Sequence, residues 1–378
     1  MKVSRIRLEN WKNFKHLDLQ FHRRAFFVGP NASGKSNLLD VLRFLRDLAG
    51  PQGGFQTAVA ARGGVGQLRC FHARQSPTIA IDVSIDLDDG GEWRYRLEFG
   101  QDTQRIPIVK REQVWRGDHS LFERPDDADR ADPNRLTQTY LEQVNANKEF
   151  REIAEFFAQI RYLHLVPQLV RDPERSRSRA EDPFGTDFLE RIAATPRKTQ
   201  TSRLRRINAA LRLAVPQLGE VNLERDSRGV PHLRGRSEHW RPSAGWQSEE
   251  HFSDGTLRLL GLLWALLDGT APLLLEEPEL SLHAAIVRQV PSMMARAGGK
   301  SRRQVFVSTH SFELLSDPTI APEEVVLLAP SDQGTTASLA ADHREIKALL
   351  EGGLTMAEAV LPMTEPAAAS QLAIQLGG

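Results

Sequence analysis

The sequence predicts an α/β protein with a mixed sheet, an N-terminal antiparallel β subdomain and an inserted lid of helices and irregular segments. Three observations predict this fold class. The apolar run at residues 25–28, typical of a strand buried on both faces, ends in a glycine and precedes a helical apolar pattern at 38–48. Residues 79–99 alternate between apolar and polar side chains around a Gly-containing turn, which predicts an antiparallel hairpin. Two later apolar runs, 273–275 and 305–307, have the length of short buried strands.

The predicted elements follow the chain in a simple order. Before the hairpin we expect strands at 3–8, 17–21 and 25–28, the helix at 38–48 and a Gly-rich irregular stretch at 53–66. After it we expect helices at 136–160 and 202–213, an apolar helix at 257–267, strands at 273–275, 305–307 and 325–328, and a helix from about 282. We divide the chain into two halves of one head (1–100 and 246–340), an inserted lid or arm (101–245) and an Ala-rich tail (341–378).

Bulk composition narrows the class of protein. The 378 residues include 49 Lys and Arg and 49 Asp and Glu, so the formal net charge is zero and the global balance demands no nucleic-acid partner. The single cysteine, Cys70, excludes a disulfide framework. The opening residues are too polar for a signal peptide, and the most apolar stretch, 257–267, is too short to cross a bilayer. We therefore expect a cytoplasmic protein with no membrane partner.

The insertion differs from the rest of the chain. No heptad pattern is sustained, so a long coiled-coil arm is not expected. Between Arg171 and Arg212 there are 11 Lys and Arg against 6 Asp and Glu, a local excess of 5. This excess fits either a surface that follows a phosphate backbone or a solvated Arg-rich face.

The loop at residues 29–36, GPNASGKS, matches the phosphate-binding pattern G-x-x-x-x-G-K-[ST]. Its glycines let backbone N–H groups point at phosphate oxygens, and the following helix contributes its positive end. Lys35 is expected to reach the β- and γ-phosphates, and Ser36 to ligate Mg²⁺. A chance Gly-rich turn is the alternative, but the loop lies between a predicted strand and a predicted helix, as the motif requires.

Two acids follow the apolar run at 273–275. Glu276 is placed to hold Mg²⁺, through water, and Glu277 to orient or activate the attacking water. The alternative is a strand that meets solvent in an acidic turn. Because phosphoryl transfer needs both parts, the phosphate-binding loop favours the functional interpretation.

Two further motifs are less specific. Ser253 is a good N-cap for the apolar helix and Gly255 allows close backbone approach, which fits a capped core helix. The same helix N-terminus could instead face the γ-phosphate of a nucleotide held by another subunit. His310 comes just after the strand at 305–307, where it fits a γ-phosphate sensor or an ordinary surface or core histidine.

Together GPNASGKS, FSDGT, LLLEEPE and STHS, in that order, resemble the ABC-type ATPase heads of the SMC, RecF and OLD-like families, as does the opening IRLENWKNFK. The resemblance covers residues 1–100 and 246–330, and is greatest to the bacterial branch of predicted AAA-type ATPases with a short insertion. It implies a P-loop NTPase of ABC/SMC-head type with ATP and Mg²⁺ as cofactors. It also implies catalytic roles for Glu277 and His310 and Mg²⁺ contacts from Ser36 and Glu276. Nucleotide contacts within the chain are implied for Gly29, Asn31, Ala32, Ser33, Gly34, Lys35, Ser36 and Asn37. Ser253 and Gly255 are implied to contact the nucleotide of another subunit, in trans.

Three departures from the family pattern concern hydrolysis more than ATP binding. Asp254 stands where the family signature has a glycine, and Glu276 stands where it has an aspartate. The glutamine loop has no clear place, and Gln67, after the Gly-rich stretch, is the candidate.

The resemblance implies an ATPase that forms ATP-dependent head dimers in DNA maintenance, repair or anti-phage defence. A transporter subunit is disfavoured because 218 residues separate Lys35 from Ser253. The remaining alternative is an ATP-binding sensor or scaffold with little turnover that assembles a separate effector such as a nuclease. We expect a homodimer through the ATP sites, with DNA and such an effector as further candidate partners. The 68 residues after His310 are too few for the nuclease domain of OLD-like proteins.

Overall fold

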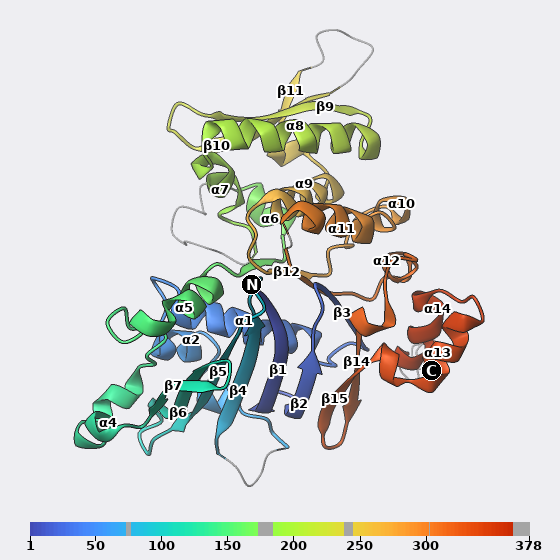
Figure 1. Cartoon of the computed structure of the whole chain (residues 1–378). Coiled ribbons are helices and arrows are strands. Elements are labelled where there is room, and N and C mark those ends of the chain that lie inside the picture. Colours follow the sequence, from blue (N-terminus) through green and yellow to red (C-terminus); the bar gives the residue numbers. More distant parts are fainter. Residues whose placement is uncertain (73–76, 173–183, 238–244, 302, 366–378) are drawn as a thin grey trace, which may run out of the picture.

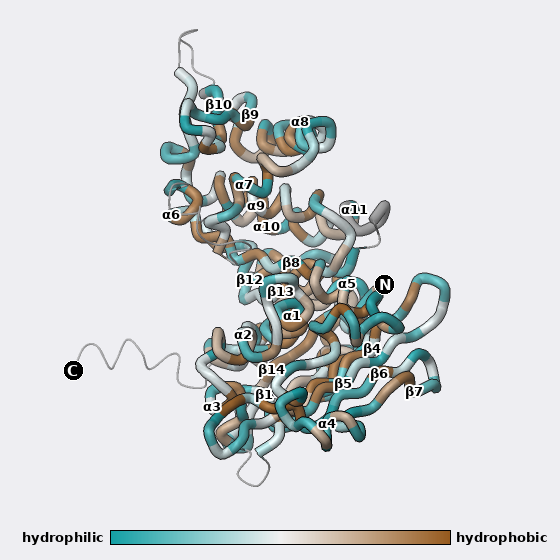
Figure 2. Tube along the Cα trace, turned by 90° about the vertical axis from the view of Figure 1, so that its left-hand side faces the viewer, coloured by the Kyte–Doolittle hydropathy of each residue, from teal (hydrophilic) through white to brown (hydrophobic). Residues whose placement is uncertain are grey.

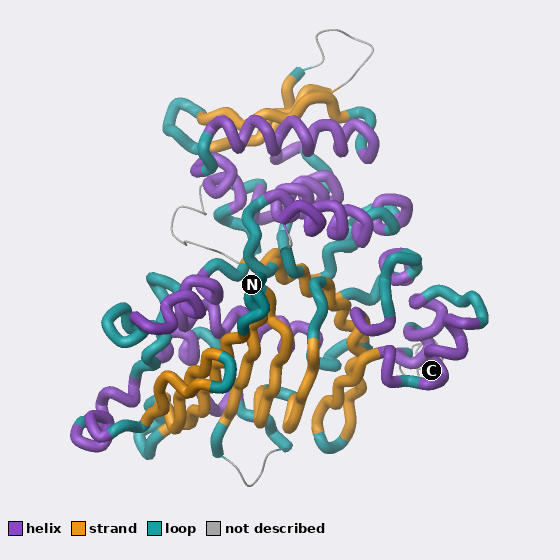
Figure 3. The backbone as a smooth tube through the Cα atoms, in the orientation of Figure 1, coloured by secondary structure: helices purple, strands orange, loops and turns teal. Residues whose placement is uncertain are grey.

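Three sheets organise the residues that the computed structural model describes, which are 1–72, 77–172, 184–237, 245–301 and 303–365. An antiparallel sheet and a mostly parallel sheet form the lower part of the molecule in Figure 1, and a smaller sheet lies in an arm above them. Figure 2, turned by 90°, shows the same separation of the arm from the two larger sheets. Figure 3 shows the strands of the two larger sheets gathered in the lower part of the molecule, with helices to their sides and above them.

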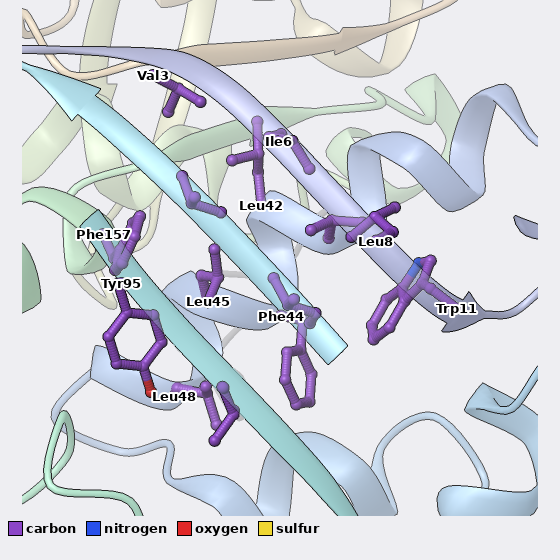
Figure 4. Close-up of a cluster of buried hydrophobic side chains, with 14 of the residues drawn as sticks. Val3, Ile6, Leu8, Trp11, Leu42, Phe44, Leu45, Leu48, Tyr95 and Phe157 are labelled. Atoms are coloured by element: carbon purple, nitrogen blue, oxygen red, sulfur yellow. The ribbon is translucent and has the colours of Figure 1, made fainter. Parts of the chain in front are cut away.

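The antiparallel sheet has the strand order β2-β1-β4-β5-β6-β7. Alternate apolar residues of its strands are buried against helix α1 (Lys35–Ala49), as Figure 4 shows for β1 and α1. This one-sided burial explains the alternation that predicted the hairpin. The strands are β1 (Lys2–Trp11), β2 (Phe14–Gln20), β4 (Ile79–Asp86), β5 (Glu92–Gln101), β6 (Pro107–Arg116) and β7 (His119–Arg124).

The mostly parallel sheet has the order β15-β14-β3-β13-β12-β8, and only β15 runs antiparallel to its neighbour. Its central strands are buried on both faces: Leu274 packs towards α1, whereas Leu273 and Leu275 pack into a second core with the C-terminal helices. That burial explains the continuous apolar runs in the sequence. The strands are β3 (Arg24–Val28), β8 (Arg161–Leu163), β12 (Leu273–Glu276), β13 (Val305–Ser308), β14 (Val325–Ser331) and β15 (Gly334–Leu339).

The described residues of the arm form the helices α6 (Pro167–Val170), α7 (Phe188–Ala194) and α8 (Arg197–Ala214) and a three-stranded sheet of β9 (Leu218–Arg225), β10 (Pro231–Ser237) and β11 (Trp246–Ser248). Helix α9 (Asp254–Leu267) lies at its base. Leu262 and Leu266 of α9 belong to the core of the parallel sheet, whereas Leu257 and Trp264 belong to the core of the arm. One helix therefore joins the arm to the head.

The expected insertion at 101–245 is not one unit. Residues 107–124 form β6 and β7 of the antiparallel sheet, and 161–163 form β8 of the parallel sheet. The expected boundary at residue 101 therefore falls at the last residue of β5, within one sheet. These strands are hard to recognise because they bury charge: Glu112 and Arg124 are fully buried and pair at 3.4 Å.

The remaining helices refine the other expectations. The helix expected at 136–160 is confined to α5 (Arg151–Ala158), and the Gly-rich stretch contains α2 (Phe55–Ala60) and α3 (Val65–Leu68). The expected tail includes α13 (Arg344–Glu351) and α14 (Met356–Val360), whose apolar residues join the second core, while 366–378 lie outside the described residues. The others are α4 (Asp127–Ala131), α10 (Ala284–Val287), α11 (Val290–Ser301) and α12 (Phe312–Leu315). In the described ranges, no helix has the length and apolar character needed to cross a membrane.

Candidate active site

The carboxyl ends of four parallel strands meet at one edge of the sheet. β12 pairs with both β8 and β13, and β13 pairs with β3, so Glu276 lies level with Ser308. Two backbone hydrogen bonds extend this alignment beyond the strands: Glu277 N donates to Ser308 O at 3.0 Å, and Thr309 N donates to Phe27 O at 3.1 Å. The edge thus gathers the phosphate-binding loop after β3, the acids after β12 and the histidine after β13.

The phosphate-binding loop has the tight conformation that its glycines allow. A Cβ on Gly29 would lie 2.6 Å from the carbonyl oxygen of Leu328, so a side chain has no room there. Gly34 has a φ of 99°, in the left-handed region that favours glycine. Ala32 has a φ of 62° without that freedom, so the loop places a residue with a Cβ in a conformation that usually needs support.

The Lys35 ammonium lies at this loop. It is largely buried and donates to the backbone carbonyls of Gly29, at 2.9 Å, and Pro30, at 3.1 Å. Burial lowers the pKa of Lys35, and the carboxylates of Glu277 and Glu276 oppose that shift. A buried cation that is hydrogen-bonded to neutral carbonyls, in a loop that precedes a helix, fits a polyphosphate ligand.

Asn13 supports the loop from the turn between β1 and β2, a role that the sequence analysis missed. Its Nδ2 donates to Ser33 O at 2.9 Å and to Thr335 Oγ1 at 2.7 Å. Asn37 Nδ2 donates to Asn13 Oδ1 at 2.8 Å, so the structure gives this predicted nucleotide contact a role in bracing the loop. The only signal was the position of Asn13 in the opening segment that resembles the family.

The two predicted Mg²⁺ ligands contact each other. The Ser36 hydroxyl donates to one oxygen of the Glu276 carboxylate, and the Tyr162 hydroxyl of β8 donates to the other. The Arg43 guanidinium lies 4.2 Å from the centre of the Tyr162 ring. Burial and Glu276 raise the pKa of Tyr162, so this hydroxyl stays a donor. A hydroxyl beside a carboxylate is the oxygen donor set that Mg²⁺ prefers, and these residues fit that ion.

Glu277 and His310 face each other across the strand ends. Glu277 has a φ of 44°, and its Oε1 lies 3.4 Å from Nε2 of His310. Both side chains are about one-third exposed, so water reaches them. Burial and then the Lys35 charge lower the pKa of His310, while Glu277 opposes the shift. The imidazole is therefore neutral at pH 7, with Nε2 able to accept or donate a hydrogen bond according to its tautomer.

Glu279 is a second residue that the sequence analysis quoted but gave no role. Its Oε1 accepts from the Thr309 hydroxyl at 2.6 Å and from the His310 backbone N–H at 3.1 Å. Burial raises the pKa of this carboxyl group. Glu279 thereby fixes the segment that carries His310.

The start of α9 forms a separate cluster. Ser253 caps the helix by accepting from Thr256 N at 3.1 Å, and a Cβ on Gly255 would lie 2.5 Å from Ser281 O. Both sequence-based expectations about local structure are therefore confirmed. Within the described part of the chain, no hydrogen bond or ion pair connects Ser253 or Gly255 to the phosphate-binding loop.

The unusual Asp254 has partners in the arm. Arg171 Nη2 donates to Asp254 Oδ1 at 2.6 Å and to Phe252 O at 2.7 Å, and Gln168 Nε2 donates to Asp254 Oδ2 at 3.3 Å. The acid that replaces a glycine is thus paired with the arginine that directly follows α6. Its charge would otherwise oppose phosphate binding at this helix end.

The residue that follows β8 contacts the end of β12, while the role of Gln67 as the glutamine-loop candidate stays a prediction. Gln67 is exposed on α3. His164, which follows β8, places Nδ1 at 3.4 Å from the carbonyl oxygen of Glu276. The signal that could have found this strand is the Tyr162–Leu163–His164–Leu165 alternation before Pro167.

The fold is that of an SMC head, and the cluster contains the phosphate-binding loop of a P-loop NTPase. A family model described as "AAA domain, putative AbiEii toxin, Type IV TA system" matches residues 24–316. Because the match covers more than half of the chain, the chain belongs to this family.

Curated relatives match a short segment of the chain. A 46-residue segment, 12% of this chain, is 44% identical to the DNA replication and repair protein RecF of Lactococcus lactis subsp. cremoris (strain MG1363), and it covers 13% of that protein. The RecF of L. lactis subsp. lactis (strain IL1403) matches to the same extent. The matched segment therefore spans about an eighth of either RecF.

Two solved SMC heads share the fold. An SMC head bound to the C-terminal winged-helix domain of ScpA has a TM-score of 0.57 and 13% identity, covering 89% of this chain and 98% of that one. An SMC head with an extended coiled coil, bound to the C-terminal domain of ScpA derived from Pyrococcus furiosus, has a TM-score of 0.53 and 13% identity, covering 93% and 100%. At this identity the likeness extends to the fold alone.

Proposed function

We propose that this protein binds ATP with Mg²⁺ in its phosphate-binding loop and hydrolyses it to ADP and phosphate in the cytoplasm. The observation that carries the proposal is the meeting of Ser36 and Glu276 beside the buried Lys35. A chance Gly-rich turn would have no reason to place its serine hydroxyl against a carboxylate supplied by a strand 240 residues away along the chain. The loop, the acids and the histidine occupy one edge of one sheet.

The residues divide the work of phosphoryl transfer. Backbone N–H groups of the loop and Lys35 bind the phosphates, and Ser36 and Glu276 would hold the metal. Bound Mg²⁺ would neutralise charge on the β- and γ-phosphate oxygens. The Glu277 carboxylate accepts a proton or hydrogen bond from the attacking water. Neutral His310 hydrogen-bonds to the γ-phosphate and so senses its presence.

We further propose that two chains pair through their ATP sites. The capped N-terminus of α9, with Ser253 and Gly255, would complete the site of the partner. The separation of this cluster from the loop of its own chain supports the proposal, because its donors then remain for another ligand. The RecF similarity supports a role in DNA maintenance or repair, and the family description supports one in defence.

A sensor or scaffold with little turnover is the second candidate, acting with a separate effector such as a nuclease. Asp254 favours it, because an acid lies where the phosphate of a partner's ATP would approach α9. Asp254 is paired with Arg171. If this ion pair had to break or move before a partner's ATP could approach α9, closure of the site would be slow.

The test is ATP turnover of the purified protein against protein concentration, with and without duplex DNA. Specific activity that rises with concentration, together with a dimer in light scattering only when ATP is present, is the expected result. Glu277→Gln is the control and should bind ATP in a longer-lived dimer. Tight ATP binding with negligible turnover at every concentration would favour the scaffold, and absence of ATP binding would refute the proposal.

A further inference from the structure

Helix α8 of the arm has a charge composition unlike that of the rest of the chain. It contains six Lys and Arg residues and no acid, although the whole chain is electrically balanced. One of them, Arg203, pairs with Asp268 at 2.7 Å. The other five are exposed, and no ion pair or hydrogen bond of the described residues engages their side chains: Arg197, Lys198, Arg205, Arg206 and Arg212.

The inner face of α8 fixes the helix in place. Leu204, Ile207 and Leu211 are buried in the core of the arm. Asn208 exchanges two hydrogen bonds with the backbone of Val221 on β9, at 3.0 and 2.9 Å. The outer face is therefore held in a defined orientation while its cations point to solvent.

The cations on the outer face are regularly spaced. Lys198, Arg205 and Arg212 recur every seven residues, which returns to the same face of a helix. At a rise of 1.5 Å per residue, neighbours lie about 10 Å apart and the row is about 21 Å long. Ser202 and Ala209 lie on the same face between these cations, and both are exposed and small, so a ligand can approach the helix backbone closely there.

We propose that the outer face of α8 binds the phosphodiester backbone of duplex DNA. Cations about 10 Å apart cannot converge on one phosphate, whereas duplex DNA carries a charge about every 1.7 Å along its axis. The helix has no aromatic side chain, which the stacked bases of a single strand would require. Its apolar face is buried in the core of the arm, and Leu213 is the one large apolar side chain exposed on this helix, which is too little to insert into a membrane.

The surface also connects to the ATPase head. Arg203 of α8 pairs with Asp268, the residue that follows α9, and its guanidinium lies 5.2 Å from the centre of the Trp264 ring. DNA held on α8 would therefore be attached to the helix whose N-terminus carries Ser253. This inference rests on the DNA part of the proposed function, but binding to α8 needs no ATP turnover.

The experiment compares two triple variants that each remove three positive charges. In the first, Lys198, Arg205 and Arg212 become Gln, and in the matched control Lys110, Arg111 and Arg130, which are exposed on β6 and α4, become Gln. Affinity for a 30-base-pair duplex is measured by fluorescence anisotropy at several salt concentrations. ATP turnover without DNA is measured on the same samples.

The α8 variant should bind DNA roughly tenfold to a hundredfold more weakly at 0.1 M salt, and its log–log salt slope should fall by about 2.7. The control should bind DNA normally, and DNA-independent turnover should be unchanged in both. Equal losses in both variants, or none in the α8 variant, would overturn the inference. If the wild-type protein binds DNA but shows no ATP turnover, that result would count against the ATPase proposal alone.

A second measurement needs no loss of charge. Ala209→Cys places a thiol in the middle of the proposed surface, and the native Cys70 is buried, so a fluorophore can be attached selectively. Its emission should change as duplex DNA is added and saturate with the anisotropy signal. An unresponsive label at saturating DNA, or a response only to phosphatidylserine vesicles, would contradict the proposal.

Discussion

The phosphate-binding loop and α8 both present positive charge to a ligand, but they do so in opposite ways. In the loop, backbone N–H groups and one largely buried lysine converge on a single point. On α8, five exposed cations are spread along one rigid helix. A convergent site selects a compact polyphosphate, whereas a dispersed one selects a polymer and depends steeply on salt.

Three arginines on the surface of the antiparallel sheet show neither arrangement. On the antiparallel sheet, Arg5 pairs with Asp18, while Arg94 and Arg96 contact Asp82, which is buried beneath them. Positive charge there is balanced locally. An arginine that is paired with an acid is therefore less available to a ligand than an unpaired one. Exposure alone does not distinguish the two.

The largest expected effect tests whether the two sites are independent. Lys35→Ala removes the single cation on which the loop converges, so the Kd for ATP should rise by about a hundredfold or more. DNA affinity measured without nucleotide should be unchanged, because α8 keeps all its charges. Isothermal titration with an ATP analogue checks the first result. Unchanged ATP affinity would show that the loop does not bind the phosphates.

Next in size is the loss of the acid that handles water. Glu277→Gln should lower turnover by roughly 10²–10⁴-fold, the range for removing a general base. ATP binding should persist, since Lys35 and the loop are untouched. Single-turnover hydrolysis and nucleotide retention on a spin column check both results. Normal turnover would assign the water to another residue.

A smaller effect is expected from the residue that orients the metal site. Tyr162→Phe removes the hydroxyl that donates to Glu276. The affinity for Mn²⁺ in the presence of ATP should fall about tenfold, because residues that hydrogen-bond to a metal ligand orient it. Electron paramagnetic resonance of free Mn²⁺ measures it. Tyr140→Phe, which removes a hydroxyl that donates to Asp126 at 3.1 Å, is the matched control. Equal weakening in both would deny Tyr162 a specific role.

The smallest effect concerns pH. Burial and Lys35 lower the pKa of His310, so this histidine stays mostly neutral at pH 6.5, where an ordinary histidine is half protonated. ATP turnover should therefore fall less than about twofold between pH 7.5 and 6.5. A fall that tracks an ordinary histidine pKa, and that disappears in His310→Gln, would contradict the environment described for this residue.

The sequence predicted the head well because its signals are local. The loop at Gly29 to Ser36, the strand before Glu276 and the cap at Ser253 each depend on neighbours in the chain, and the structure has them at the expected positions. Their chemical roles remain predictions. The contacts of Tyr162 and Asn13 depend on strand order, which no local pattern encodes.

The region from 101 to 163 was less predictable for a different reason. Glu112 lies fully buried, where it accepts hydrogen bonds from Tyr95 Oη and from the backbone N–H groups of Tyr140 and Leu141. In the sequence such a strand has the composition of a solvated loop. Only the three-dimensional packing reveals that its polar groups are satisfied inside the sheet.

The segment from Tyr162 to Arg171 is anchored at both ends, to Glu276 and to Asp254. It behaves as a tether of fixed length, since β8 and α6 leave only three residues between them in neither element. A tilt of the arm about its base must therefore lengthen or break one of these two hydrogen-bonded anchors. Because this segment is short, even a small rotation of α9 would displace the Tyr162 hydroxyl and with it the Glu276 carboxylate of the proposed metal site.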